Sequence, residues 1–155
     1  MFAQIQALLN NLRSFLNEPR IRLYSMAVKC IGLQLSSPNN IALGCVDSLN
    51  ELHRRVFGKK IVEASSTIKL KFALDNDRSF VQVYTPAPCD IVLSVTGTGN
   101  GKLSNGHTGI VLTDRKIASN SSVNGRWTQN YTIDTWVARY SSYGQMATVF
   151  YRKLT

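Results

Sequence analysis

Apolar residues recur every three or four positions through the first third of the chain, which is the spacing of amphipathic helices. The first such segment lies in residues 1–19 and ends at Pro19; its apolar positions are Phe2, Ile5, Leu8, Leu9, Leu12, Phe15 and Leu16. A second segment runs from about Arg22 to Leu35. A third lies in IALGCVDSLNELHRRVFGKK, where Gly58 provides a helix stop. We expect three helices, the first of which packs its apolar face on the body of the protein.

After Ser65 the helical spacing gives way to residue patterns typical of β-strands. The segment IKLKFAL predicts a short helix or an extended piece, whereas FVQVY, DIVLSV, HTGIVL and MATVFYR carry the β-branched and aromatic residues typical of strands. Helices first and strands later indicate an α+β fold, with N-terminal helices packed on a small antiparallel sheet. The 155 residues are enough for one domain, which we place at 20–155, after the helical segment 1–19.

The net charge of +9 favours anionic partners. The lysines and arginines are scattered and match no motif that reads DNA or RNA, which argues against nucleic acid and leaves an anionic cell-wall or envelope polymer. No stretch has the length of a membrane span. Residues 1–19 lack the basic start and unbroken apolar run of a signal peptide, and their polar face has Arg13 as its one base, which disfavours a membrane-surface helix. We expect a monomer made in the cytoplasm without a signal peptide.

Three cysteines without a CxxC pair predict neither a zinc site nor a disulfide framework. Cys30 lies in an apolar helical stripe, and Cys89 lies in a proline-rich turn, so both are interpreted as structural. Cys45 follows Gly44 at the expected start of the third helix, where free amide groups and the helix dipole favour a thiolate. The sequence therefore favours Cys45 as a nucleophile.

A nucleophilic thiol needs a base, and the chain has two histidines. His53 follows Cys45 by eight residues on one helix, a rise of about 12 Å, which is too far. His107 begins HTGIVL, which we expect to pair with IASNSS through a two- or four-residue turn, so that His107 and Asn120 share a face and the amide orients the imidazole. The alternative is a polar pair on a solvent-facing side of the hairpin.

The order of these motifs resembles the NlpC/CHAP-type cysteine peptidases and amidases. The motifs are GCVDSLNELHRRVFG, PCDIVLS, NGHTGIV and IASNSS, followed by SVNGRWTQNYTIDTWVARY, and the resemblance spans about Tyr24 to Arg152. The branch most similar is that of phage and bacterial cell-wall hydrolases. In one respect the sequence departs from the family, because Cys89 stands where the usual Pro-Gly-Asp turn has glycine.

The resemblance implies a papain-like core in which Cys45 is the nucleophile, His107 the general base and Asn120 the residue that orients the base. It implies no metal and no other cofactor. The implied substrate is an amide bond of peptidoglycan, within the stem peptide or between that peptide and muramic acid, so that the protein would act at the bacterial wall or periplasm after delivery by a phage or a secretion system. The alternatives are a basic binding module without catalysis, and a related cysteine hydrolase or toxin that acts on another amide.

Overall fold

The computed structural model describes residues 2–99, 102–143 and 146–155 and confirms the α+β class. The helices are α1 (Phe2–Leu16), α2 (Pro19–Lys29), α3 (Cys45–Phe57), α4 (Thr67–Asn76) and α5 (Ile133–Tyr143), with short 3₁₀ turns η1 (Pro38–Asn40) and η2 (Thr113–Arg115). The strands are β1 (Phe80–Val83), β2 (Ile91–Ser94), β3 (Gly97–Gly99), β4 (Lys102–Ser104), β5 (His107–Val111), β6 (Lys116–Asn120), β7 (Trp127–Thr132) and β8 (Thr148–Lys153).

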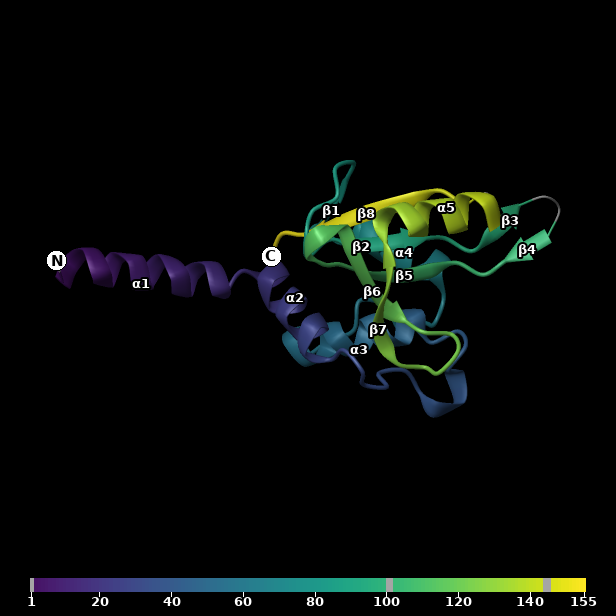
Figure 1. Cartoon of the computed structure of the whole chain (residues 1–155), viewed down its shortest axis with the longest axis horizontal. Helices are drawn as coiled ribbons and strands as arrows, with labels where there is room; N and C mark the ends of the chain where they lie inside the picture. Colours follow the sequence, from purple (N-terminus) through teal and green to yellow (C-terminus); the bar gives the residue numbers. More distant parts are fainter. Residues whose placement is uncertain (1, 100–101, 144–145) are drawn as a thin grey trace.

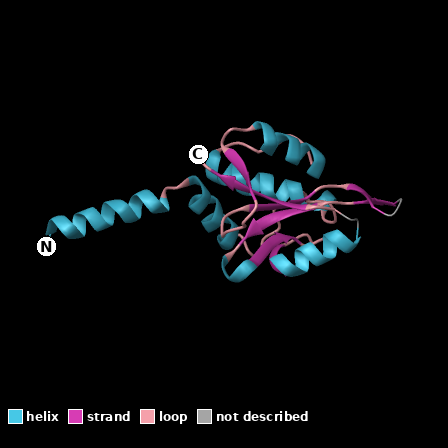
Figure 2. Cartoon of the chain, turned by 90° about the horizontal axis from the view of Figure 1, so that it is seen from above, coloured by secondary structure: helices cyan, strands magenta, loops and turns pink. Residues whose placement is uncertain are grey.

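One antiparallel sheet with the strand order β1-β8-β2-β5-β6-β7 forms the centre of the body (Figure 1). Strand β2 is buried on both faces because helices cover both (Figure 2). Ile91 and Leu93 pack in one core with residues of α2, α3 and α4, including Leu23, Leu49 and Leu70. Val92 points to the other core, which contains Trp136 and Tyr140 of α5. The helices α3 and α5 thus lie on opposite faces of the sheet.

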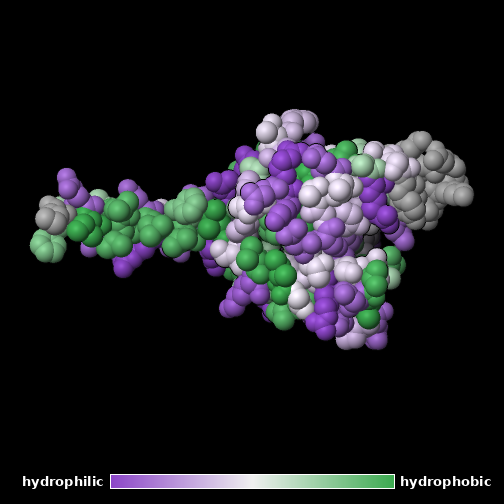
Figure 3. All heavy atoms as spheres, in the orientation of Figure 1, coloured by the Kyte–Doolittle hydropathy of each residue, from purple (hydrophilic) through white to green (hydrophobic). Residues whose placement is uncertain are grey.

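Helix α1 departs from the prediction that it packs on the body. It projects away from the sheet, and none of its residues is buried (Figure 1). Its apolar positions are exposed, from 42% at Leu9 to 90% at Phe2, and apolar atoms line the projecting helix in Figure 3. The expectation was wrong because an amphipathic pattern shows that a helix has an apolar face but not what covers it.

Helix α2 is shorter than expected and begins earlier. Pro19 occupies its first turn, where the missing N–H of proline costs nothing. The helix ends at Lys29 because Gly32, at φ +90°, turns the chain toward the start of β7. There the Gly32 amide donates to the Trp127 carbonyl at 2.7 Å, and the Trp127 amide donates to the Leu33 carbonyl at 2.8 Å. Helix α3, in contrast, begins at Cys45 and ends before the left-handed Gly58, as predicted.

Candidate active site

Cys45 is the first residue of α3, with Gly44 at the N-cap. A side chain at position 44 would collide with Ser36, whose Cβ lies 2.3 Å from an ideal Cβ built there. Glycine therefore allows the segment before the helix to fold tightly against Ser36. This close approach sets the position of Cys45, whose side chain is buried except for 6% of its surface.

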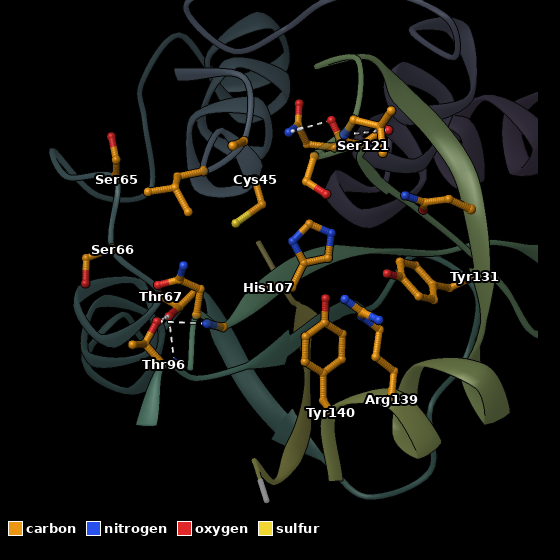
Figure 4. Close-up of a pocket in the computed structure, with 18 residues that line it drawn as sticks. Cys45, Ser65, Ser66, Thr67, Thr96, His107, Ser121, Tyr131, Arg139 and Tyr140 are labelled. Atoms are coloured by element: carbon orange, nitrogen blue, oxygen red, sulfur yellow. Dashed lines mark hydrogen bonds between the residues drawn. The ribbon is translucent and has the colours of Figure 1, made fainter. Parts of the chain in front are cut away.

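His107 begins β5 and faces the thiol. In Figure 4 the sulfur of Cys45 and the imidazole of His107 point toward one another inside a cleft. The cleft has a volume of about 540 Å³, and both residues line it. The structure thus brings together the two residues that the sequence predicts as nucleophile and base, from a helix start and a strand start that lie 62 positions apart (107 − 45).

The segment before His107 is fixed by a short chain of hydrogen bonds from the start of α4. The hydroxyl groups of Thr67 and Thr96 lie 2.8 Å apart, and the Thr96 amide donates to the Thr67 hydroxyl at 2.9 Å. The Gly106 amide donates to the Thr96 hydroxyl at 2.9 Å. Thr67, Thr96 and Gly106 line one wall of the cleft. Their hydrogen bonds fix the backbone at Gly106, the residue directly before His107.

Aromatic side chains hold the His107 ring from the other side. The ring stacks on Trp136 at a centroid distance of 5.2 Å and an interplanar angle of 22°, and on Tyr140 at 6.0 Å and 26°. Tyr131 meets it edge-on at 6.2 Å. Trp136 is fixed in turn by its indole N–H, which donates to Ser94 Oγ at 3.0 Å. The imidazole plane is therefore set by packing against α5 and β7.

A directional hydrogen-bond chain determines which imidazole nitrogen can act as a base. Ser119 Oγ donates to Asn130 Oδ1 at 2.7 Å, so its proton is already used. His107 Nε2, 3.0 Å from Ser119 Oγ, must then be the donor in that contact. With the proton on Nε2, Nδ1 carries the free lone pair. Sequence reasoning missed Ser119 and Asn130 as orienting residues, although Ser119 lies in the quoted IASNSS motif.

Asn120 does not occupy the predicted place. Strands β5 and β6 pair Gly109 with Ser119 and Val111 with Ile117, one residue away from the predicted register. The Leu112 amide donates to the Lys116 carbonyl at 2.7 Å and closes the turn η2, in which Asp114 and Arg115 are left-handed at φ 55° and 57°. The pairing is therefore centred on Asp114 rather than between Asp114 and Arg115. A shift of one residue moves every side chain of a strand to the opposite face. The predicted pairing of Asn120 with the imidazole is therefore wrong.

Asn120 instead binds the segment that carries the cysteine. Its Oδ1 accepts hydrogen bonds from Ser48 Oγ of α3 at 3.1 Å and from Ser36 Oγ at 3.4 Å. Its Nδ2 donates to the Ile41 carbonyl at 2.9 Å. Asn120 is almost completely buried, so these contacts connect strand β6 to both ends of the turn that precedes Cys45.

Burial favours the neutral forms of the Cys45 thiol and the His107 imidazole. It raises the pKa of the Cys45 thiol to about 11, against a lowering by the backbone amides of Thr108, Val46 and Cys45 itself. Burial, together with the smaller effect of the nearby positive charge of Arg139, lowers the pKa of His107 to about 4. At neutral pH the site therefore holds a protonated thiol beside an imidazole that is free to accept a proton.

The other cysteines and the second histidine lie elsewhere. His53 is buried, and its Nδ1 lies 2.7 Å from the Lys59 carbonyl. Cys30 and Cys89 are free and buried, and neither lines the described cleft. Cys89 has a φ of 81°, a conformation that favours glycine, which accounts for the glycine usual at this turn in the family that the motifs resemble.

Two kinds of feature are missing from the part of the chain that the structure describes. No helix there is long and apolar enough to cross a membrane. Among the same residues, no three or more His, Cys, Asp or Glu side chains gather where they could hold a metal ion.

Comparisons with known proteins give a fold but no family. No family model matches the sequence, and no curated protein matches it. Among solved structures, the fold is similar to that of a chain in the crystal structure of the type VI native effector–immunity complex Tae3-Tai3 from Ralstonia pickettii. The TM-score is 0.55 at 16% identity, and the match covers 86% of this chain and 98% of the other. At this identity the likeness shows a shared fold.

Proposed function

We propose that this protein is a cysteine hydrolase that cleaves an amide bond of peptidoglycan. The observation that carries the proposal is the chain from Asn130 through Ser119 to His107, which leaves Nδ1 as a base in the cleft that contains the Cys45 thiol. A buried thiol, a base and a residue that fixes the base form the arrangement that acyl transfer requires. A binding module without catalysis has no use for it.

The reaction would proceed by acyl transfer. His107 Nδ1 takes the thiol proton while Cys45 Sγ attacks the amide carbonyl, and Nε2–H keeps its hydrogen bond to Ser119 as the ring becomes cationic. The oxyanion develops next to the first turn of α3, where the free backbone N–H groups and the helix dipole favour negative charge. His107 then protonates the leaving amine, and a water molecule hydrolyses the thioester.

The cleft lining and the net charge support the substrate class. The cleft walls carry hydroxyl and amide groups, which suit a polar peptide or sugar–peptide substrate. The net charge of +9 suits an anionic wall polymer. The fold is shared with a chain of a type VI effector–immunity complex, and we include in the proposal delivery by a secretion system and an immunity-type protein as a further partner.

Digestion of purified peptidoglycan tests the proposal. The wild-type protein should release new amino and carboxyl ends, identified by mass spectrometry, and these ends locate the bond that is cut. Cys45→Ala should release none, while Cys30→Ala serves as the matched thiol control and should cleave normally. Cleavage of another amide substrate but not of peptidoglycan would keep the cysteine mechanism and refute the substrate. Normal cleavage by Cys45→Ala would refute the mechanism.

A further inference from the structure

The cleft holds a cation next to the base. Arg139 comes from α5, and in Figure 4 its side chain points into the cleft toward His107, with the guanidinium between the side chains of Tyr131 and Tyr140. The guanidinium carbon lies 6.0 Å from the centre of the Tyr140 ring. The ring of Tyr131 lies beside that of Tyr140, at a centroid distance of 6.3 Å. These contacts restrict the position of the guanidinium before any substrate arrives.

The other described residues that line the cleft are uncharged or only weakly basic, which makes the Arg139 guanidinium the main charge in it. Among the lining residues that the structure describes, Arg139 alone carries a permanent charge, and none is an aspartate or a glutamate. The polar lining of the cleft consists of hydroxyl and amide groups, and Tyr131 lies near the guanidinium in Figure 4. A guanidinium next to hydroxyl donors is the usual protein site for a carboxylate, which it binds through two parallel hydrogen bonds.

We propose that Arg139 binds a carboxylate of the substrate and selects amide bonds that have a free carboxylate within a few atoms of the scissile carbonyl. The inference rests on the proposed hydrolase function and specifies its substrate. Because the guanidinium lies beside the base rather than at the far end of the cleft, the carboxylate must lie close to the bond that is cut. A neutral amide at that place would lose the charge-assisted contact.

The carboxylate would also assist the chemical step. The positive charge of Arg139 disfavours a second positive charge on His107, and the imidazolium that forms during attack is such a charge. A carboxylate bound to Arg139 would offset this repulsion when the proton moves to Nδ1. The selection should therefore appear in kcat as well as in KM.

Wall fragments with and without free carboxylates test this. Disaccharide–peptide fragments are released from peptidoglycan by a muramidase and divided into two portions. In one portion the carboxylates are converted to amides with carbodiimide and ammonia. The wild-type protein should favour the free carboxylates by about 10- to 100-fold in kcat/KM, and Arg139→Gln should reduce kcat/KM by a similar factor on these fragments but by less than about threefold on the amidated ones. Arg139→Lys should lie in between, because it keeps the charge without the planar fork.

Two controls test the role of Arg139 separately from the proposed hydrolase function. Arg78→Gln removes an exposed arginine outside the cleft and should leave both rates unchanged. Equilibrium binding of both fragment sets to Cys45→Ala, and to Cys45→Ala with Arg139→Gln, measures the preference without catalysis. An equal loss on both fragment sets, or equal binding of both, would overturn the role of Arg139. An absence of all hydrolysis alongside a binding preference that depends on Arg139 would refute the hydrolase and keep the carboxylate site.

Discussion

Ser119 and Asn120 are consecutive residues of β6, and each serves a different half of the candidate catalytic pair. The Ser119 hydroxyl lies 3.0 Å from His107 Nε2, whereas Asn120 Oδ1 accepts from Ser48 at 3.1 Å on the helix that begins with Cys45. Successive side chains of a strand point to opposite faces of the sheet, so β6 contacts the imidazole from one face and the helix that carries Cys45 from the other, and the two side chains meet in the cleft.

Substitution of these neighbours should give different defects. Ser119→Ala should lower kcat by roughly 10- to 100-fold, because the imidazole loses the partner that fixes its tautomer. It should also cost about 1–3 kcal/mol of the free energy of unfolding, because the Nε2–H of His107, which faces the buried Ser119 side chain, is left without an acceptor. Steady-state kinetics measures kcat, and circular dichroism checks the fold. Asn130→Ala should follow Ser119→Ala but less severely, because the serine hydroxyl would remain. Full activity of Ser119→Ala would remove the orienting chain from the mechanism.

Asn120→Ala should act on stability first. Its loss leaves the buried hydroxyls of Ser36 and Ser48 without their acceptor, which costs about 1–3 kcal/mol of the free energy of unfolding. Urea unfolding measures this cost. A loss of activity with unchanged stability and with a shifted pH profile would instead favour direct contact of Asn120 with the imidazole.

Thiol reactivity should separate Cys45 from the other cysteines. Iodoacetamide should modify Cys45 first, because it is the one cysteine of the described structure that lines the cleft beside a base. Cys45→Ser should lower hydrolysis by at least about 10³-fold without unfolding the protein, while Cys89→Ala should stay active. Mass spectrometry of the alkylated protein identifies the modified residue, and faster modification of Cys30 or Cys89 would contradict this assignment.

The pH dependence of alkylation should show a plateau. The pKa is about 4 for His107 and about 11 for Cys45, so the number of protons bound by the pair is constant between these two values. The rate of Cys45 alkylation should therefore stay level from about pH 5 to 10 and fall below pH 4. In His107→Gln the rate should instead rise about tenfold per pH unit toward pH 11, as the lone thiol ionises. A plateau in His107→Gln would show that another group takes the proton.

The lowered pKa of His107 also has a consequence for stability. The unfolded chain, at the ordinary pKa of 6.5, binds a proton that the folded protein excludes down to about pH 4. Stability should therefore fall as the pH drops from 6.5 to 4, by about 3 kcal/mol for this group. His53, whose pKa burial also lowers, adds a loss of the same sign. Urea unfolding of the wild type and of His107→Gln at several pH values measures the difference, and equal slopes would contradict the assignment.

Removal of α1 should leave the body intact. None of its residues is buried, so deletion of residues 1–16 should change the free energy of unfolding by less than about 1 kcal/mol and should not reduce hydrolysis. Leu23→Ala in α2 is the matched comparison, and it should cost about 2–5 kcal/mol because Leu23 is completely buried. A large loss on deletion would show that α1 packs on the body after all.

Salt should separate attraction to the wall from the chemical step. The net charge of +9 attracts a polyanion over a distance that salt shortens to about 8 Å at 0.15 M. Hydrolysis of intact walls should therefore weaken strongly with added salt, and hydrolysis of a small uncharged peptide only slightly. Equal salt dependence on the two substrates would limit the charge to a role in solubility.

The local features of this protein could be predicted from the sequence. The glycine–cysteine start of α3, its stop at Gly58 and the strand that begins at His107 each depend on a few adjacent residues, and all three are observed. The α+β class follows in the same way, because the change from helical spacing to β-branched runs is a property of consecutive residues.

Tertiary structure decided the rest. The turn with the two left-handed residues of η2 centres the β5–β6 pairing on Asp114 rather than between Asp114 and Arg115, and this shift by one residue sends Ser119 rather than Asn120 to the imidazole. A bulge in the β6–β7 pairing leaves Asn130 without a partner across the ladder, and its side chain accepts from Ser119. Turn conformations and bulges depend on how distant strands settle against one another, so a single residue pattern determines that a strand exists but not which face each of its side chains joins.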